Sequence, residues 1–178
     1  MAHNRISRRG FFRKAGAGTL AYLLAANGLA EVGAGGKAPN FVFLFVDDMG
    51  WADVGCYGNT FHETPHIDRL AADGLRFTDA YAACPVCSPT RASLMTGKYT
   101  PRTGVTDWIP GNSYNDVPLE CQQTQEYLSL DEVTLAEALK AGGYNTAFLG
   151  KWHLGKEKYY PTEQGFDSYF GLPYSNDM

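Results

Sequence analysis

A cysteine, a proline and an arginine stand at fixed spacing at residues 87–91, in the sequence C-S-P-T-R. Ser88 and Pro89 are typical of the residue that caps a helix and of the first residue inside it. We therefore expect Cys87 on a loop that opens into a helix, with the Arg91 guanidinium one turn further on. Free backbone N–H groups and the positive end of the helix dipole favour an oxyanion at such a place. The residues predict a binding place for sulfate or phosphate.

Two adjacent carboxylates, Asp47 and Asp48, form a second group with possible chemistry. Like charges so close together repel, and one would be protonated if both were buried without a cation. They therefore suggest a hard, oxygen-preferring divalent ion, Ca²⁺ or Mg²⁺. Taken alone, however, two aspartates more often cap a turn or face solvent. A third group, Lys151 and His153, would on its own be an ordinary polar loop.

The elements that must position these groups are strands and helices in alternation. We expect strands at 40–46, 75–81 and 144–149, and helices from Thr64-Pro65 to Gly74, from Ser88 to Gly97, and from Asp131 to Lys140 before Gly142-Gly143. Residues 108–127 are typical of a long surface loop. Each of the three chemical groups follows an expected strand, and an open parallel sheet places its site outside the carboxyl ends of its strands. The pattern predicts an α/β fold with one site at one edge.

The three groups stand in blocks that resemble the type I sulfatases. The blocks are F-L-F-V-D-D-M-G-W at 43–51, C-S-P-T-R-A-S-L-M-T-G-K at 87–98 and G-Y-N-T-A-F-L-G-K-W-H-L-G at 143–155. The resemblance runs from about Pro39 to Met178 and includes G-F-D at 165–167 and G-L-P-Y-S-N-D-M at 171–178. It implies an alkaline-phosphatase-like fold with a mixed, mostly parallel sheet flanked by helices. Because such proteins run to several hundred residues, it also implies an N-terminal part that is incomplete at the C-terminus.

The resemblance assigns roles to the candidate residues. Cys87 would be oxidised after synthesis to formylglycine by a formylglycine-generating enzyme, and Arg91 would hold the hydrated aldehyde. Lys151 would contact formylglycine and a sulfate oxygen, and His153 would hydrogen-bond formylglycine and take its proton. Asp47 and Asp48, with the modified Cys87, would bind calcium or magnesium, although the later ligands of that family are absent from this sequence. The implied activity is hydrolysis of sulfate esters. One hydroxyl of the hydrate attacks sulfur and expels the alcohol, and loss of a proton from the other hydroxyl then breaks the carbon–oxygen bond and releases sulfate.

Other functions remain open on the residues alone. C-P-V-C at 84–87 matches a C-x-x-C redox spacing, but no thioredoxin-like strand and helix surround it. A zinc site is disfavoured because no second cysteine or histidine pair follows at ligand spacing. A phosphomonoesterase of the same superfamily and a truncated, non-catalytic remnant are the main alternatives. Pairing among Cys56, Cys84 and Cys121 is not fixed by the sequence, and we assign His62 and His66 no role beyond structure.

The first 30 residues differ in composition from the rest of the 178-residue chain. S-R-R-G-F-F-R-K at 7–14 precedes an uncharged stretch rich in Ala, Leu and Gly, which is typical of a twin-arginine export signal. The stretch is too short and too interrupted by glycine for a stable membrane span. We expect a signal at 1–30, a linker at 31–38 and the catalytic domain at 39–178, in a periplasmic or secreted protein that engages the export machinery.

The charge balance excludes one class of partner. Cleavage after residue 30 would remove five basic and no acidic residues, leaving ten basic against nineteen acidic residues and a net charge of −9. Such a surface argues against nucleic acid, and an anionic sulfate ester must be attracted by local positive charge. For an exported enzyme we expect glycan or aryl sulfates as substrates.

Overall fold

The computed structural model of the protein describes residues 38–111, 118–119 and 123–174. The expected signal, most of the linker and Cys121 lie outside these residues. The chain divides into one unit that ends at Phe45 and another that begins at Val46. In the described residues the second unit contains helices α2 (Pro65–Asp73), α3 (Cys87–Thr96), α4 (Thr100–Thr103) and α5 (Leu135–Ala141), short 3-10 helices η2 (Trp51–Asp53), η3 (Gly55–Tyr57), η4 (Glu157–Tyr159) and η5 (Pro161–Gln164), and strands β1 (Ala147–Lys151) and β2 (Ser168–Leu172).

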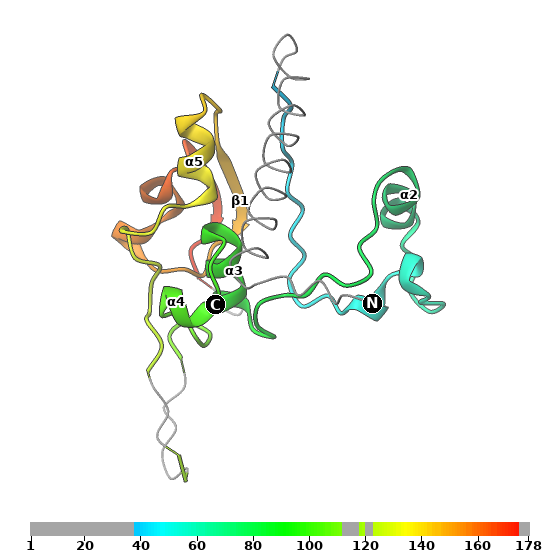
Figure 1. The fold of residues 1–178 in the computed structure, drawn as a ribbon, viewed down its shortest axis with the longest axis horizontal. Helices are drawn as coiled ribbons and strands as arrows, with labels where there is room; N and C mark the ends of the chain where they lie inside the picture. Colours follow the sequence, from blue (N-terminus) through cyan, green and yellow to red (C-terminus); the bar gives the residue numbers. More distant parts are fainter. Residues whose placement is uncertain (1–37, 112–117, 120–122, 175–178) are drawn as a thin grey trace, which may run out of the picture. The chain divides into compact units, whose positions relative to one another are not determined.

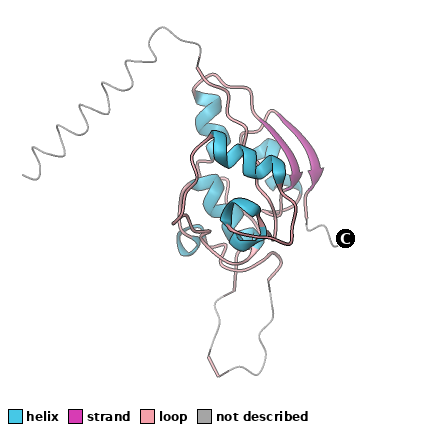
Figure 2. Cartoon of the chain, turned by 90° about the vertical axis from the view of Figure 1, so that its right-hand side faces the viewer, coloured by secondary structure: helices cyan, strands magenta, loops and turns pink. Residues whose placement is uncertain are grey.

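The two strands form a parallel pair in which Ala147 faces Ser168 and Lys151 faces Leu172 (Figure 2). Two glycines, Gly150 and Gly171, are partners in this register. A Cβ atom on Gly171 would lie only 2.0 Å from the Gly150 carbonyl oxygen, so the close approach of the strands requires glycine there. The third expected strand, 144–149, is thus present but lies three residues later at its start and two at its end, directly before the candidate site.

The other two expected strands were wrong within the described residues. Residues 40–46 form no strand, and their apolar side chains are exposed, Val42 to 84%. Residues 75–81 form no strand either, and the Phe77 carbonyl accepts a hydrogen bond from the Tyr57 hydroxyl instead of from a neighbouring strand. An extended apolar segment becomes a strand only when a partner satisfies its backbone groups, and composition does not reveal that partner.

The helix signals were more reliable. Helix α2 has Thr64 at its N-cap and Gly74 at its C-cap, as expected. Helix α5 begins later than expected, because Thr134 rather than Asp131 is its cap: the Thr134 hydroxyl accepts from the Glu137 N–H, and Glu137 accepts from the Thr134 N–H. This reciprocal capping box satisfies two helix-end groups at once, whereas Asp131 is engaged with Ser129.

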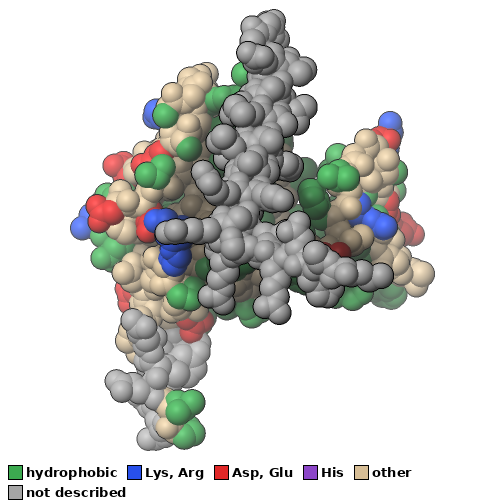
Figure 3. Space-filling view, viewed as in Figure 1, with side chains coloured by type: hydrophobic (Ala, Val, Ile, Leu, Met, Phe, Trp, Pro, Cys, Tyr) green, Lys and Arg blue, Asp and Glu red, His purple; other side chains and the backbone are tan. Residues whose placement is uncertain are grey.

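The hydrophobic core lies around α3 and the segment that follows β1. It consists of the buried residues Ala92, Met95, Val105, Ile109, Leu128, Trp152 and Leu154, with Phe148 and Phe166 packed against it. Helix α3 contacts α4 and α5, which are labelled in Figure 1. Apolar side chains that the core does not cover remain visible on the surface in Figure 3. Within the described residues, no helix is both long enough and apolar enough to cross a bilayer.

Candidate active site

Three of the predicted site residues meet through one carboxylate. The Arg91 guanidinium donates to Asp47 Oδ1 at 2.8 Å, and the Lys151 ammonium donates to Asp47 Oδ2 at 2.6 Å. A second Arg91 N–H donates to the Lys151 carbonyl oxygen at 2.5 Å. Arg91 therefore links Lys151, the last residue of β1, to Asp47, which follows the exposed segment 40–46. The predicted convergence is present, although only one of the three expected strands leads into it.

This cluster is largely withdrawn from water. The side chains of Arg91, Lys151 and Asp47 are 7%, 11% and 23% exposed. Burial by itself would raise the pKa of Asp47, but the hydrogen bonds and charges of Lys151 and Arg91 outweigh it and lower the pKa. Asp47 is thus ionised and is bound by two cations. Positive side chains gathered in this way suit an anionic ligand.

His153 lies two residues beyond β1 and is almost completely buried. Its backbone N–H donates to the Pro173 carbonyl, which extends the strand pairing, and its φ of 57° is unusual for a residue other than glycine. Its Nε2 lies 2.6 Å from the Ile109 carbonyl oxygen. Burial lowers the pKa of His153, and the positive charges of Lys151 and Arg91 act in the same direction against the opposing effects of Ile109 and Asp47. The imidazole is therefore kept neutral near pH 7.

Cys87 is the first residue of α3 rather than a loop residue, because Val86 occupies the N-cap position. The expectation that Ser88 caps the helix was wrong: Ser88 is fully buried inside the first turn, and its hydroxyl accepts from the Ile109 N–H at 3.1 Å. Gly97 ends α3 in the left-handed conformation, φ 67°, as expected. Cys87 is half-buried with a free thiol, and Cys84 and Cys56 are free as well.

The second aspartate behaves differently from the first. Asp48 is exposed and lies in a turn with φ 57°. Calcium takes about six to eight oxygen ligands. Both oxygens of Asp47 already have cationic partners, and the part of the chain that the structure describes holds no group of three His, Cys, Asp or Glu side chains close enough for a metal. Carboxylate chemistry suits a hard cation, but the described residues do not make up its site.

Sequence reasoning missed the two groups that hold His153 in place, the Ile109 carbonyl and the Pro173 carbonyl. Both are backbone groups, so no residue type announces them. The buried Ser88 hydroxyl is a side-chain group, and a buried hydroxyl needs a hydrogen-bond partner.

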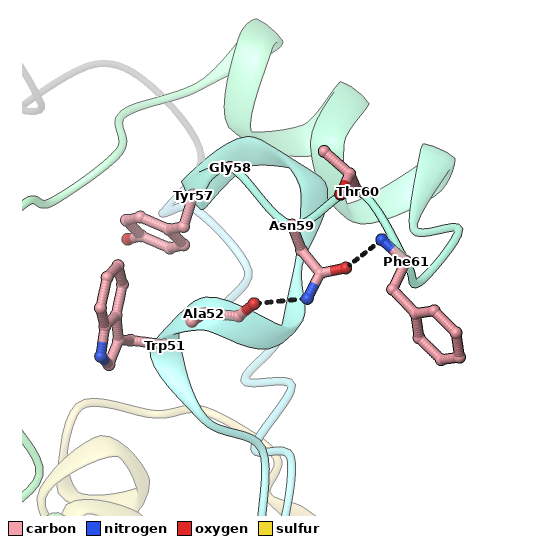
Figure 4. A pocket seen from close by; sticks show the side chains of 7 residues that line it. All are labelled: Trp51, Ala52, Tyr57, Gly58, Asn59, Thr60 and Phe61. Atoms are coloured by element: carbon pink, nitrogen blue, oxygen red, sulfur yellow. Dashed lines mark hydrogen bonds between the residues drawn. The ribbon is translucent and has the colours of Figure 1, made fainter.

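A separate hollow of about 370 Å³ is lined by residues of the segment 51–61. Figure 4 shows the rings of Trp51 and Tyr57 turned toward one another and the Asn59 side chain bonded to the Ala52 carbonyl and the Phe61 N–H. None of the candidate site residues lines it. The hollow is open, and the groups with chemistry lie in the Asp47 cluster instead.

Comparisons with known proteins identify the family of this chain. The family model described as Sulfatase matches residues 39–178. Arylsulfatase G of Canis lupus familiaris is 46% identical over 144 residues, which cover 80% of this chain and 25% of the relative. The solved structure of the PsFucS1 sulfatase from Pseudoalteromonas sp. has a TM-score of 0.67 at 36% identity and covers 87% of this chain and 30% of that one. Ps i-CgsB, solved in complex with k-i-k-neocarrahexaose, has a TM-score of 0.62 at 37% identity, over 72% of this chain and 27% of that one.

The chain therefore belongs to the sulfatase family. The predicted α/β class with an alkaline-phosphatase-like, partial domain is confirmed by these structural similarities and by the parallel strand pair. The chain spans about a quarter of the length of the curated relatives that it matches.

Proposed function

We propose that this chain is the N-terminal part of a sulfuric ester hydrolase that cleaves aryl or glycan sulfates through a formylglycine derived from Cys87. The observation that supports it most strongly is the joining of Arg91, Lys151 and Asp47 beside the first turn of α3. That arrangement brings two mostly buried cations together, and one of them, Arg91, stands one turn after Cys87 on α3. The site residues are Cys87, Arg91, Lys151 and His153.

Each of these four residues has a defined task in this proposal. As formylglycine, residue 87 would supply a hydrated aldehyde that attacks sulfur and later releases sulfate. Arg91, fixed by Asp47 and by the Lys151 carbonyl, orients that hydrate and balances its charge. Lys151 places its ammonium at the developing negative charge of the sulfuryl oxygens. His153, neutral and buried, accepts a proton in the release step.

A divalent metal is also part of the proposal. Asp47, Asp48 and the modified Cys87 are the proposed ligands of Ca²⁺, or of Mg²⁺, and further oxygen ligands are needed from beyond the described residues. For Asp47 to bind a metal, its contacts with Arg91 and Lys151 must be shared or loosened, because both carboxylate oxygens are engaged.

Substrate, partners and location belong to the same proposal. A glycan sulfate is favoured because a solved structure similar to this chain carries a neocarrahexaose. Maturation of Cys87 requires a formylglycine-generating enzyme. We propose export by a twin-arginine signal at 1–30 to the periplasm or the medium. A linker follows at 31–38 and the catalytic part at 39–178. Replacement of Arg8 and Arg9 by lysine should abolish export.

The decisive experiment is the mass of the peptide that contains Cys87, measured on the native full chain, together with sulfate and phosphate release from matched esters. The proposal predicts an aldehyde at residue 87, sulfate release well above phosphate release, and no turnover in Cys87→Ala with unchanged folding. The matched control is Cys84→Ala, which removes the neighbouring half-buried thiol and should retain activity.

Four results would contradict the proposal in different ways. Sulfate release retained in Cys87→Ala would refute the nucleophile. Faster release of phosphate than of sulfate would favour the related phosphomonoesterases. An unmodified thiol with thiol exchange that requires both Cys84 and Cys87 would favour a redox protein, and an unmodified thiol with no activity would mean a non-catalytic remnant.

A further inference from the structure

We propose that Ser88 is a positioning residue for His153 and acts through the backbone of Ile109. The Ser88 hydroxyl accepts a hydrogen bond from the Ile109 N–H at 3.1 Å. The carbonyl oxygen of the same residue lies 2.6 Å from His153 Nε2. Ser88, the residue after Cys87, is thus connected to His153 through Ile109, which comes from a different part of the chain.

The contact with Ile109 determines which nitrogen of His153 carries hydrogen. A backbone carbonyl can only accept a hydrogen bond, so Nε2 must be the donor. In the neutral ring, Nδ1 then has a free lone pair. Nδ1 is buried and has no hydrogen-bond partner among the described residues. The geometry therefore presents Nδ1, and not Nε2, as the atom that accepts a proton.

Burial makes this chain of contacts rigid. Ser88 is fully buried, and Ile109 and His153 are each 1% exposed. Water therefore cannot replace the Ser88 hydroxyl if it is removed, and the Ile109 N–H would be left without a partner. The Ile109 N–H and carbonyl belong to consecutive peptide groups that share the Ile109 Cα. A shift of the Ile109 backbone that gave the N–H a new partner would therefore displace the carbonyl from His153. Ser88 thereby holds the acceptor that fixes the ring of His153.

The effect on catalysis rests on the proposed sulfate-ester hydrolysis, whereas the hydrogen-bond chain does not. Ser88→Ala in the full chain should lower kcat about tenfold to a hundredfold and leave KM within about twofold, because the ring is misplaced without loss of a substrate contact. The fraction of formylglycine at residue 87 is measured on each sample, and rates are expressed per modified site.

Ser93→Ala is a matched control on the same helix. The Ser93 hydroxyl oxygen is also buried, but it has no hydrogen-bond partner among the described residues. Its removal takes away an equal volume and no hydrogen bond to Ile109. We expect kcat within about twofold of the original protein. Equal losses of kcat in the Ser88 and Ser93 variants would overturn the positioning role.

A spectroscopic test does not depend on enzymatic activity. In the full chain labelled with ¹⁵N-histidine, the signals of His153 are identified by their loss in His153→Gln. We expect an Nε2–H ring at neutral pH with slow exchange of that hydrogen, and a rise of the Nδ1–H form in Ser88→Ala. An Nδ1–H or doubly protonated His153 in the original protein would overturn the inference. If residue 87 is unmodified and no sulfate is released, the proposed function fails, but the assignment of His153 is still decided.

Discussion

Helices α2 and α3 begin and end with equally clear signals, yet only one of them is part of a core. Helix α3 buries Ala92, Met95 and Arg91 and contacts α4 and α5. Helix α2 has a proline in its first turn and a glycine at its end, but none of its residues is buried, and Leu70 is 65% exposed. Local signals are thus enough to form a helix, whereas stability and chemistry come from what a helix packs against.

The same contrast holds for charged groups. Asp47 forms ion pairs with two mostly buried cations, whereas the Arg69–Asp73 pair on α2 has side chains that are 82% and 70% exposed. Exposed pairs contribute little, while removal of one member of a buried pair leaves an uncompensated charge. The two regions should therefore respond very differently to substitution.

The largest expected effect is that of Asp47→Asn. The substitution keeps the shape but leaves the Arg91 and Lys151 cations, which are mostly buried, without their shared anion. The free energy of unfolding should fall by about 3–5 kcal/mol. Denaturant unfolding in the presence of a chelator measures it. Asp48→Asn is the control and should change stability by less than about 0.5 kcal/mol, because Asp48 is exposed and asparagine tolerates its backbone conformation.

A core substitution in each helix tests the comparison directly. Met95→Ala in α3 removes a side chain that is 9% exposed and should lower the free energy of unfolding by about 2–4 kcal/mol. Leu70→Ala in α2 removes a mostly exposed side chain and should change it by less than about 0.5 kcal/mol. Paired urea titrations give both values. A loss for Leu70→Ala as large as that for Met95→Ala would mean that α2 has a packing partner beyond the described residues.

A smaller effect is expected at the start of α5. Thr134→Ala removes the capping box with Glu137 and a hydrogen bond to the Gln164 carbonyl, and should destabilise by about 1–2 kcal/mol. Asp131→Ala, at the position that the sequence suggested as the cap, should have an effect below about 0.5 kcal/mol. Thermal or urea unfolding separates the two, and the reverse order would restore Asp131 as the cap.

The smallest change is a pH effect at Asp167. Lys140 and the Thr146 backbone lower the pKa of Asp167 from 3.8 to about 2. Because the folded pKa is below the unfolded one, this group's contribution to stability is complete above about pH 4 and is lost as the pH falls toward about 2. Asp167→Asn should remove this part of the acid dependence. Unfolding midpoints at about pH 5 and pH 2.5 provide the measurement, and an unchanged difference between them would contradict the assignment.

Much of the site could be predicted because its residues are defined by type and spacing. The resemblance carried by C-S-P-T-R and by the blocks around Asp47 and Lys151 singled out residues that the fold brings together. The strands were harder to predict. An apolar run such as 40–46 has strand composition, but pairing depends on a neighbour far along the chain, and no local pattern encodes that neighbour.

The sequence by itself determined the family, both ends of α2 and the C-terminal end of α3, because these depend on side-chain types within a few positions of one another. Only the tertiary structure decided that Arg91 pairs with Asp47, which lies 44 residues away in the sequence. It also decided that the Ile109 carbonyl contacts His153, again over a separation of 44 residues. It also decided that Ser88 faces the core and not the helix end. Such contacts join backbone groups and distant side chains, and their partners are chosen by packing rather than by local sequence.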